Sequence, residues 1–522
     1  MTRPLAPVLM VQGTASHAGK STLVTAICRI LRQDGYRVAP FKSQNMALNS
    51  FVAAEGGEIG RSQALQAEAA GLDPSIDMNP ILLKPEADAH SQVIIAGRSI
   101  GSMPARVYQQ RKLEFWPVVT AALDRLRSQY DIVVAEGAGS PAEINLAATD
   151  LANMRVARHA DAAVLLVGDI DRGGVFASIL GTLELLEPAD RALVRGFAIN
   201  KFRGDPGILA PGLDFLVERT GVPVLGVVPY LHNLDLPEED SLALDDMRSR
   251  ASNGDTSDPL DIAVVRLPHI ANFDEFAPLA AEPDVRLRYV ERAADLRRPD
   301  LLILPGTKTT VADLGWLRAS GLADSIMALA ASGVPIVGIC GGYQMLGRQI
   351  RDPEHVESEQ SAVDGLGLLP VSTTFAAIKR TVRIRGQMLA TVGPLAGARG
   401  SNLTAYEIHM GRTDVDASLS PLIHLTARSG EAVSEQDGAI SADGLLMGTY
   451  LHGLFENDAA RHALIDGLQA RRRAGSSGPA SGTEPAVRRN LAADRAFQLD
   501  RLADTVRGSL DLRPLLAACG LG

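Results

Sequence analysis

The chain contains few cysteines: only Cys28, Cys340 and Cys519 occur in 522 residues. They are widely spaced and odd in number, which argues against a disulfide framework and against a thiolate cage for a metal. Long apolar runs are also missing, and no basic N-terminal region precedes one, so neither a secretory signal nor a membrane span is expected. We therefore expect a cytoplasmic protein that does not act at a membrane.

An excess of positive charge is missing too. Lys and Arg number 51 against 61 Asp and Glu, which gives a net charge of −10. This balance argues against nucleic acid as the main partner, although a local basic pocket can still bind an acidic small molecule. The length and the 46% hydrophobic content predict about two to four globular domains with sizeable cores.

What is present is an alternation of apolar, strand-like runs with helix-like segments. This alternation predicts an α/β fold class with two doubly wound domains, each built on a mostly parallel sheet. The domains are expected at 1–237 and 260–470, joined by a polar linker at 238–259, while 471–522 are expected to combine a flexible stretch (471–486) with a closing helix near 490–514. The expected strands are 8–12, 37–42, 131–136, 163–168, 196–200 and 222–229, then 261–267, 301–304, 334–339 and 444–450.

A glycine-rich turn from Gly13 to Ser21 follows an apolar strand and begins a helix, which is the context that phosphate binding needs. Backbone N–H groups around Gly13, Thr14 and Gly19 would hold phosphate oxygens. Lys20 would neutralise them, and the hydroxyl of Ser21 would face Mg²⁺. Five residues, rather than the usual four, separate the two glycines.

Polar residues end several later strands at the same rim of the first sheet, where open α/β sheets bind ligands. Glu136 is expected to face the phosphates and hold the metal, the alternative being a solvated loop acid. Asp169 and Asp171 either bind metal or cap the next helix. Asn200 would read an adenine edge, and Lys42 would bind phosphate or a substrate carboxylate unless it is exposed at the surface.

Cys340 lies between the apolar run 334–339 and two glycines, a pattern typical of a sharp turn that exposes a nucleophile at the end of a strand. A plain buried thiol is the alternative. His452 follows another strand-like run and would serve as the base that pairs with the thiol. The N–H groups of Gly306, in a Pro-Gly-Thr turn, and of Gly341 would hold the oxyanion.

These motifs together resemble known families. Residues 260–455 resemble a class I, triad-type glutamine amidotransferase domain. The N-terminal half resembles dethiobiotin synthetase, which shares the GlyThr-x4-GlyLys loop and the GluGlyAlaGly segment. The two halves in this order resemble the cobyric acid synthase family, and this resemblance rests on the motifs at 41–50, 58–63, 136–146, 168–177 and 406–411.

The resemblance implies ATP- and glutamine-dependent amidation of a corrinoid, adenosylcobyrinic acid a,c-diamide, at its carboxylates b, d, e and g. By motif matching, Cys340 takes the role of the nucleophile and His452 that of the base, and Gln344 would help to seat the substrate glutamine. ATP and Mg²⁺ are the implied cofactors. The phosphate and metal roles fall to Lys20, Ser21 and Glu136.

One position departs from the triad pattern. The acid that usually stands two residues after the histidine is replaced by Leu454, so that His452 works in a dyad or is oriented by another acid, such as Glu456. The nearest alternative function is a related amidoligase acting on the a and c carboxylates of cobyrinic acid or on a cell-wall lipid intermediate; the motifs at 41–50 and 168–177 favour the four-amide enzyme. A nucleotide-switched partitioning ATPase is disfavoured by the intact pair of Cys340 and His452.

Overall fold

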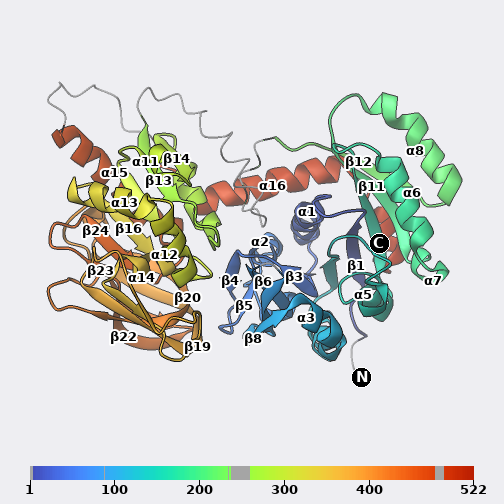
Figure 1. The fold of residues 1–522 in the computed structure, drawn as a ribbon. Coiled ribbons are helices and arrows are strands. Elements are labelled where there is room, and N and C mark those ends of the chain that lie inside the picture. Colours follow the sequence, from blue (N-terminus) through green and yellow to red (C-terminus); the bar gives the residue numbers. More distant parts are fainter. Residues whose placement is uncertain are drawn as a thin grey trace. The chain divides into compact units, whose positions relative to one another are not determined.

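The computed structural model describes residues 4–87, 89–232, 234, 236, 259–475 and 487–521. The chain forms two compact units, drawn in Figure 1. The first comprises residues 1–47, 53–237 and 492–522, and the second comprises 48–52 and 238–491. The expected linker, apart from Pro259, and residues 476–486 of the expected flexible stretch lie outside the described residues.

The first unit is built on a six-stranded sheet in the order β12-β11-β10-β1-β9-β2, with all neighbours parallel. All six residues of β1 are buried, as expected for a strand that helices cover on both faces. The predicted parallel sheet is therefore confirmed, with strand ends displaced by a few residues. Its elements are β1 (Val8–Gly13), α1 (Lys20–Gln33), β2 (Val38–Phe41), α4 (Trp116–Gln129), β9 (Ile132–Glu136), α5 (Met154–Ala160), β10 (Ala163–Asp169), α6 (Val175–Leu185), α7 (Pro188–Arg191), β11 (Val194–Phe202), α8 (Pro206–Thr220) and β12 (Val224–Pro229).

A small sheet in the order β3-β6-β7-β8 interrupts this pattern between β2 and α4 and was not predicted from the sequence. Its last two pairings are antiparallel, and β8 exposes nearly all of its side chains, so its residues lack the apolar run that marks a buried strand. The elements here are β3 (Gln44–Met46), β5 (Glu58–Gly60), α2 (Arg61–Ala70), β6 (Ile81–Ala87), β7 (His90–Ile95), β8 (Arg98–Pro104) and α3 (Ala105–Arg111).

The predicted closing helix is present as α16 (Leu491–Ser509), followed by α17 (Arg513–Ala518). It buries Leu499, Leu502 and Val506 in the core that α1 also lines. An ion pair between Arg29 of α1 and Asp500 of α16, at 2.7 Å, joins these two helices. The C-terminal residues thus complete one face of the first sheet.

The second unit also contains a parallel sheet, in the order β14-β13-β15-β16-β24, to which β23 is added antiparallel. The second predicted α/β domain is confirmed as well. Residues 471–475, expected in a flexible stretch, instead form the end of helix α15. The elements are β13 (Leu260–Val265), α10 (Ala277–Ala280), β14 (Val285–Val290), α11 (Ala293–Leu296), β15 (Leu301–Leu304), α12 (Thr310–Ala319), α13 (Leu322–Ala331), β16 (Ile336–Ile339), α14 (Gly341–Leu346), β23 (Ala439–Ile440), β24 (Leu446–Thr449) and α15 (Asp458–Gly475).

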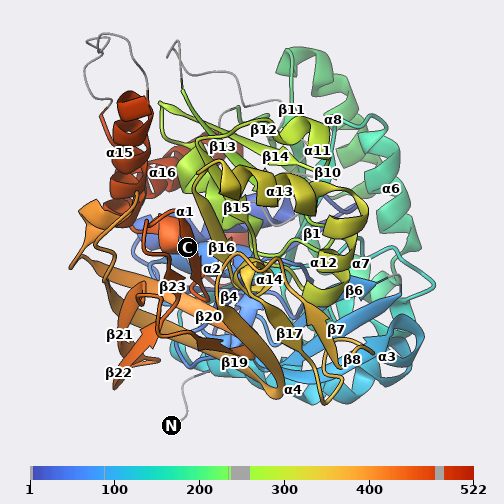
Figure 2. The same ribbon diagram turned by 60° about the vertical axis from the view of Figure 1, so that its left-hand side comes forward.

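A further sheet in this unit has the order β18-β17-β19-β21-β22, with β20 paired to β19. The two long strands β19 and β20 run side by side in Figure 2. Among the described residues, no helix has the length and apolar character that a membrane crossing requires. The remaining strands are β4 (Ser50–Val52), β17 (Gln349–Arg351), β18 (Ala362–Asp364), β19 (Val371–Met388), β20 (Asn402–Val415), β21 (Ile423–Arg428) and β22 (Glu431–Asp437).

Candidate active sites

The phosphate loop joins β1 to α1 in the first unit. Thr14 donates its N–H to the carbonyl of Val167 at 2.9 Å, which fixes the start of the loop to β10. The ammonium group of Lys20 donates to the carbonyls of Ala15 and Gly139, both at 2.9 Å. The loop therefore wraps around the ammonium group of Lys20, which places a positive charge beside the backbone N–H groups that would bind phosphate.

The last glycine of the loop lies against Asn200. Gly19 has a φ of +90°, and a Cβ atom there would lie 2.1 Å from Nδ2 of Asn200. That Nδ2 donates to the carbonyl of Ala18 at 2.9 Å. Asn200 therefore lies beside the phosphate loop as expected, but its amide donor holds the loop itself. Its role in reading an adenine edge stays a prediction.

Asp169 and Asp171 lie where β10 ends. Asp169 accepts hydrogen bonds from the N–H of Asp171 and from Nζ of Lys201, both at 2.9 Å. Lys201 also donates to the carbonyl of His17 at 2.6 Å. Helix α6 begins after Gly174 without a side-chain cap, so the expectation that either aspartate caps it is wrong. Asp169 instead closes a turn and holds a lysine that braces the phosphate loop.

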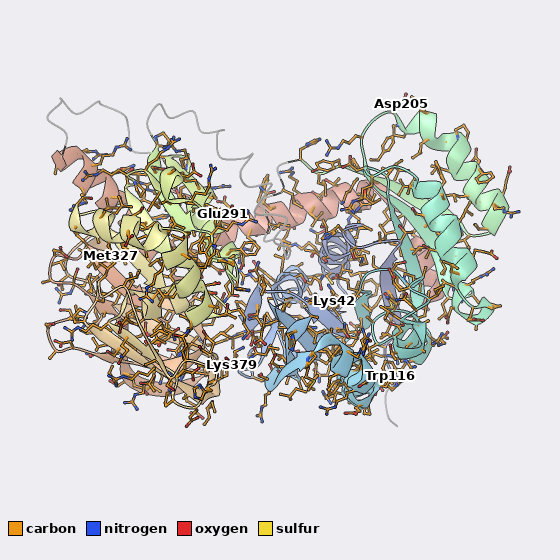
Figure 3. The ribbon with its side chains drawn as sticks, viewed as in Figure 1. Lys42, Trp116, Asp205, Glu291, Met327 and Lys379 are labelled. Atoms are coloured by element: carbon orange, nitrogen blue, oxygen red, sulfur yellow. The ribbon has the colours of Figure 1, made fainter. Side chains whose placement is uncertain are left out.

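Glu136 is the buried centre of a polar cluster beside the loop. Its carboxylate accepts from Ser21 Oγ at 2.7 Å and from Gln66 Nε2 at 2.6 Å, and it pairs with Lys42 Nζ at 2.8 Å. Lys42, labelled in Figure 3, directly follows β2, is 6% exposed and reaches the cluster through its ion pair with Glu136. The alternatives of a solvated acid and of a surface lysine are therefore wrong.

The charge of Glu136 is set by these neighbours. Burial raises the pKa of Glu136, but the ammonium group of Lys42 and hydrogen bonds from Gln66 and Ser21 outweigh burial and hold the pKa below its usual range. A hydroxyl and an ionised carboxylate are oxygen ligands of the kind that Mg²⁺ prefers, and Mg²⁺ commonly takes its other ligands from phosphates and water. Among the described residues, no group of three His, Cys, Asp or Glu side chains could hold a metal alone. Ser21 and Glu136 thus fit a metal shared with a nucleotide.

Cys340 lies between β16 and α14 in the second unit. Its φ of 51° and ψ of −109° are strained for a residue with a Cβ atom, as in turns that present a nucleophile above a sheet. Its N–H donates to the carbonyl of Thr449 at 2.8 Å, and Sγ lies 3.6 Å from the carbonyl oxygen of Ile408. The predicted sharp turn at the end of the strand is therefore confirmed.

His452 follows β24; its imidazole is buried, and Cys340 is among the neighbours that raise its pKa. Nδ1 lies 2.9 Å from Oε1 of Glu275, whose Oε2 accepts the N–H of Gly453 at 3.1 Å. Glu275 belongs to the short helix η4 (Phe273–Phe276) and is fully buried. The geometry is that of a Cys-His-Glu triad, in which Glu275 takes the position that the sequence left open between a dyad and Glu456.

Two opposing effects set the protonation of His452. Burial lowers the pKa of the imidazole, but the Glu275 carboxylate and the neighbouring Cys340 outweigh burial and raise the pKa of His452 to about 10. The imidazole is therefore protonated at neutral pH, where it can stabilise a thiolate and later release a proton. The ring of Tyr406 stacks on the imidazole, with centroids 5.4 Å apart, and covers one face of it.

The Pro-Gly-Thr turn lies against the same pair. A Cβ atom at Gly306 would lie 2.8 Å from Cε1 of His452, and one at Gly341 would lie 2.7 Å from Cγ2 of Thr307. Both predicted oxyanion glycines are thus next to Cys340 and His452. Their role as oxyanion donors stays a prediction, which the short separations support.

Gln344 lies on the first turns of α14 and is 2% exposed. Its Oε1 accepts from Thr310 Oγ1 at 3.1 Å, and its Nε2 donates to the hydroxyl of Tyr450 at 3.2 Å. Gln344 therefore braces the turn that carries Cys340. Its contact with the substrate glutamine stays a prediction.

The sequence did not indicate two of these residues. Glu275 lies 177 residues before His452, next to Asp274, and no spacing rule joins it to the histidine. The one available signal is that two acids stand between Phe273 and Phe276, which suggests burial of an acid. Gln66 lies in α2, shortly after the motif at 58–63, and a polar residue within a helix carries no signal of its own.

Two family models match different parts of the chain. Residues 9–243 match the family model of the CobQ/CobB/MinD/ParA nucleotide binding domain, and residues 261–460 match that of the CobB/CobQ-like glutamine amidotransferase domain. Among solved structures, PurLQS from Thermotoga maritima has 16% sequence identity and a TM-score of 0.31; the match covers 41% of this chain and 99% of that chain.

Similar curated proteins extend over the whole chain. The cobyric acid synthase of Pelotomaculum thermopropionicum is 52% identical over 99% of this chain and 97% of that protein. The cobyric acid synthase of Sorangium cellulosum is 51% identical over 98% of both chains, and that of Dehalococcoides mccartyi strain CBDB1 is 49% identical over 99% of this chain and 100% of that protein. With nearly its full length matched at this identity, the chain belongs to the cobyric acid synthase family.

Proposed function

We propose that this chain frees ammonia from glutamine at Cys340 and uses it, with ATP, to amidate carboxylates of a corrinoid. The observation that carries the proposal is that one chain holds both a buried Cys-His-Glu triad and a phosphate loop beside the ionised Glu136. Its similarity to proteins named cobyric acid synthase supports the same activity.

The glutaminase half begins with the thiolate of Cys340, which attacks the side-chain amide carbon of glutamine and forms a C–S bond. The oxyanion that results would be held by the N–H groups of Gly306 and Gly341. The protonated His452 gives its proton to the departing nitrogen, so that ammonia leaves and a thioester remains. Water, deprotonated by His452, then releases glutamate. Glu275 holds the imidazole in the required orientation through Nδ1.

The synthetase half must activate a carboxylate, which otherwise repels a nucleophile. Transfer of the γ-phosphoryl group of ATP to a substrate carboxylate oxygen gives an acyl phosphate and ADP, and ammonia then displaces phosphate to leave an amide. Lys20 would neutralise the phosphate oxygens from its place inside the loop. Mg²⁺, held by Ser21 and Glu136, would supply charge neutralisation to the nucleotide.

The substrate we propose is adenosylcobyrinic acid a,c-diamide, amidated at carboxylates b, d, e and g. Mass spectrometry of the product tests this choice by counting the amides gained. With cobyrinic acid offered in place of the diamide, a product that gains only two amides would identify the related a,c-diamide synthase activity instead. Amidation of a cell-wall lipid intermediate alone would exclude a corrinoid enzyme. We place the protein in the cytoplasm, where its three free cysteines would remain reduced.

The division of labour is tested with Cys340→Ser, assayed with glutamine and then with free ammonia. We expect glutamine-driven amidation to be lost and ammonia-driven amidation to persist, because only the nitrogen source is removed. Cys519→Ser is the matched control, since Cys519 lies in the first unit and is free. Equal loss with both nitrogen sources would contradict the assignment of separate roles.

A further inference from the structure

Five residues of the N-terminal half belong to the second unit. Residues 48–52, which include β4, group with 238–491, although the chain on either side of them belongs to the first unit. This segment touches the surroundings of every member of the triad, and three separate contacts show how.

The first contact is with the chain that carries Glu275. Asn49 accepts the N–H of Phe273 on its Oδ1 at 3.2 Å, and Asn272 accepts the N–H of Ser50 on its Oδ1 at 3.0 Å. Asn49 is fully buried, and Asn272 has a φ of +55° just before helix η4. This reciprocal pair fixes the start of the helix that places Glu275 against the imidazole.

The second contact reaches His452. The ring of Phe51 lies against the ring of Tyr406, with centroids 5.3 Å apart, and Tyr406 stacks on His452. Tyr406 and His452 also exchange two backbone hydrogen bonds, at 2.9 and 3.2 Å. The guanidinium of Arg383 lies 5.5 Å from the Phe51 ring and donates to the carbonyl of Val52 at 2.8 Å. Phe51 is thereby held in place behind the ring that covers the histidine.

The third contact leads to Cys340. Val52 is fully buried in a cluster with Tyr406 and Ile408. The carbonyl of Ile408 is the oxygen that lies 3.6 Å from Sγ of Cys340. The strand on which Ile408 and Tyr406 lie, β20, is therefore packed from behind by Val52 at the point where it meets the nucleophile.

We infer that Asn49 and Phe51 are positioning residues of the glutaminase, which hold Glu275 and Tyr406 in the arrangement that orients His452 toward Cys340. The inference rests on the proposed glutaminase activity. Neither side chain needs to touch glutamine for this role. The N-terminal half of the chain then contributes to glutamine hydrolysis as well as to the use of ATP.

The test uses the full chain with Asn49→Ala and Phe51→Ala, with Phe51→Tyr as the variant that keeps the ring. Asn402→Ala is the matched control, because Asn402 also accepts a side-chain hydrogen bond in the second unit but lies at the start of β20. Glutamate release is measured as kcat and KM across pH. Ammonia-driven amidation and Tm are measured in parallel.

We expect kcat for glutamine to fall at least about tenfold in both alanine variants, with KM changing less, because orientation rather than substrate binding is lost. Phe51→Tyr should restore most of the rate. The groups that face the imidazole of His452 are Glu275, Cys340 and Tyr406, and Asn49→Ala loosens only the hold on Glu275. Because Glu275 raises the pKa of His452, the alkaline limb of the pH profile of this variant should move to lower pH. A role in folding alone would lower Tm and leave that limb in place.

Alanine variants that keep kcat within about threefold of the wild type, with the alkaline limb unmoved, would overturn the inference. A fall in kcat that Asn402→Ala shares equally would overturn it as well, because the loss would then not be specific to the triad. Glutamate release by the wild-type chain tests the proposed function, whereas the ratio of variant to wild type tests the positioning role. The two failures are therefore distinguishable.

Discussion

Replacing Glu275 by glutamine should uncouple His452 from its charge partner while keeping the shape of the site. Glu275 is fully buried and bonds both Nδ1 of His452 and the N–H of Gly453. Its carboxylate is the largest of the influences that raise the pKa of His452 from 6.5 to about 10. That rise corresponds to about 5 kcal/mol of preference for the protonated imidazole.

When the carboxylate is removed, burial still lowers the pKa of His452, and the largest influence that raises it is gone. The pKa of His452 should therefore fall to about 6.5 or below. The protonated imidazole that stabilises the Cys340 thiolate and supplies the proton for ammonia would then be scarce at about pH 8. We expect kcat for glutamine to drop on the order of 10²–10⁴-fold. The alkaline limb of kcat/KM should move from about pH 10 to below about pH 8.

The assay follows glutamate release across pH, with ammonia-driven amidation as the internal control for an intact first unit. Thermal unfolding of Glu275→Gln shows whether the second unit has kept its fold. An unmoved alkaline limb, together with a kcat within about threefold of the wild type, would refute the triad geometry as the source of activity.

Three further changes test other parts of the structure. Gly306→Ala should lower glutamine-driven kcat about a hundredfold or more and spare ammonia-driven amidation, because the added Cβ would lie 2.8 Å from the imidazole of His452. Gly315→Ala is the control, because a Cβ added at Gly315 would meet no atom within 4 Å. Lys42→Met should abolish amidation with either nitrogen source, measured as ADP release, because Glu136 loses the cation that keeps it ionised; retained ADP release would contradict this. Burial raises the pKa of Asp437 from 3.8 to about 7, so between these pH values the folded state binds a proton that the unfolded state does not. The free energy of unfolding of the wild type should therefore fall by up to about 4 kcal/mol as pH rises from 3.8 to about 7. Asp437→Asn should remove that slope in urea unfolding at about pH 5 and about pH 8.

Strands that are buried on both faces could be predicted from the sequence, because parallel-sheet strands such as β1 and β15 are continuous apolar runs. The turn at Cys340 was equally predictable, since a run of apolar residues, a cysteine and two glycines leave few other conformations. The long strands β19 and β20 were not, because their side chains are largely polar or half-exposed and Ile378 is 85% exposed.

The candidate sites divide in the same way. Lys20, Ser21 and Glu136 could be placed together because Glu136 ends a strand, Lys20 and Ser21 follow the loop after another strand, and parallel strands end at the same rim. Glu275 could not, because it lies in the short 3-10 helix η4, which is too short to show a periodic sequence pattern. The grouping of 48–52 with the second unit also lacks a local signal, since hydrogen bonds such as that between Asn49 and Phe273 join residues more than 200 positions apart.

The placement of residues 48–52 bears on how such a protein can be divided or recombined. A polypeptide that starts near Pro259 would include Cys340 and His452 but would lose five residues that pack behind them. Loss of these residues would expose apolar surface of β20 to water, so the truncated fragment should hydrolyse glutamine slowly and should aggregate. Gene fission, or domain exchange with a distant relative, would therefore preserve glutamine hydrolysis only if residues 48–52 were kept together with the amidotransferase half.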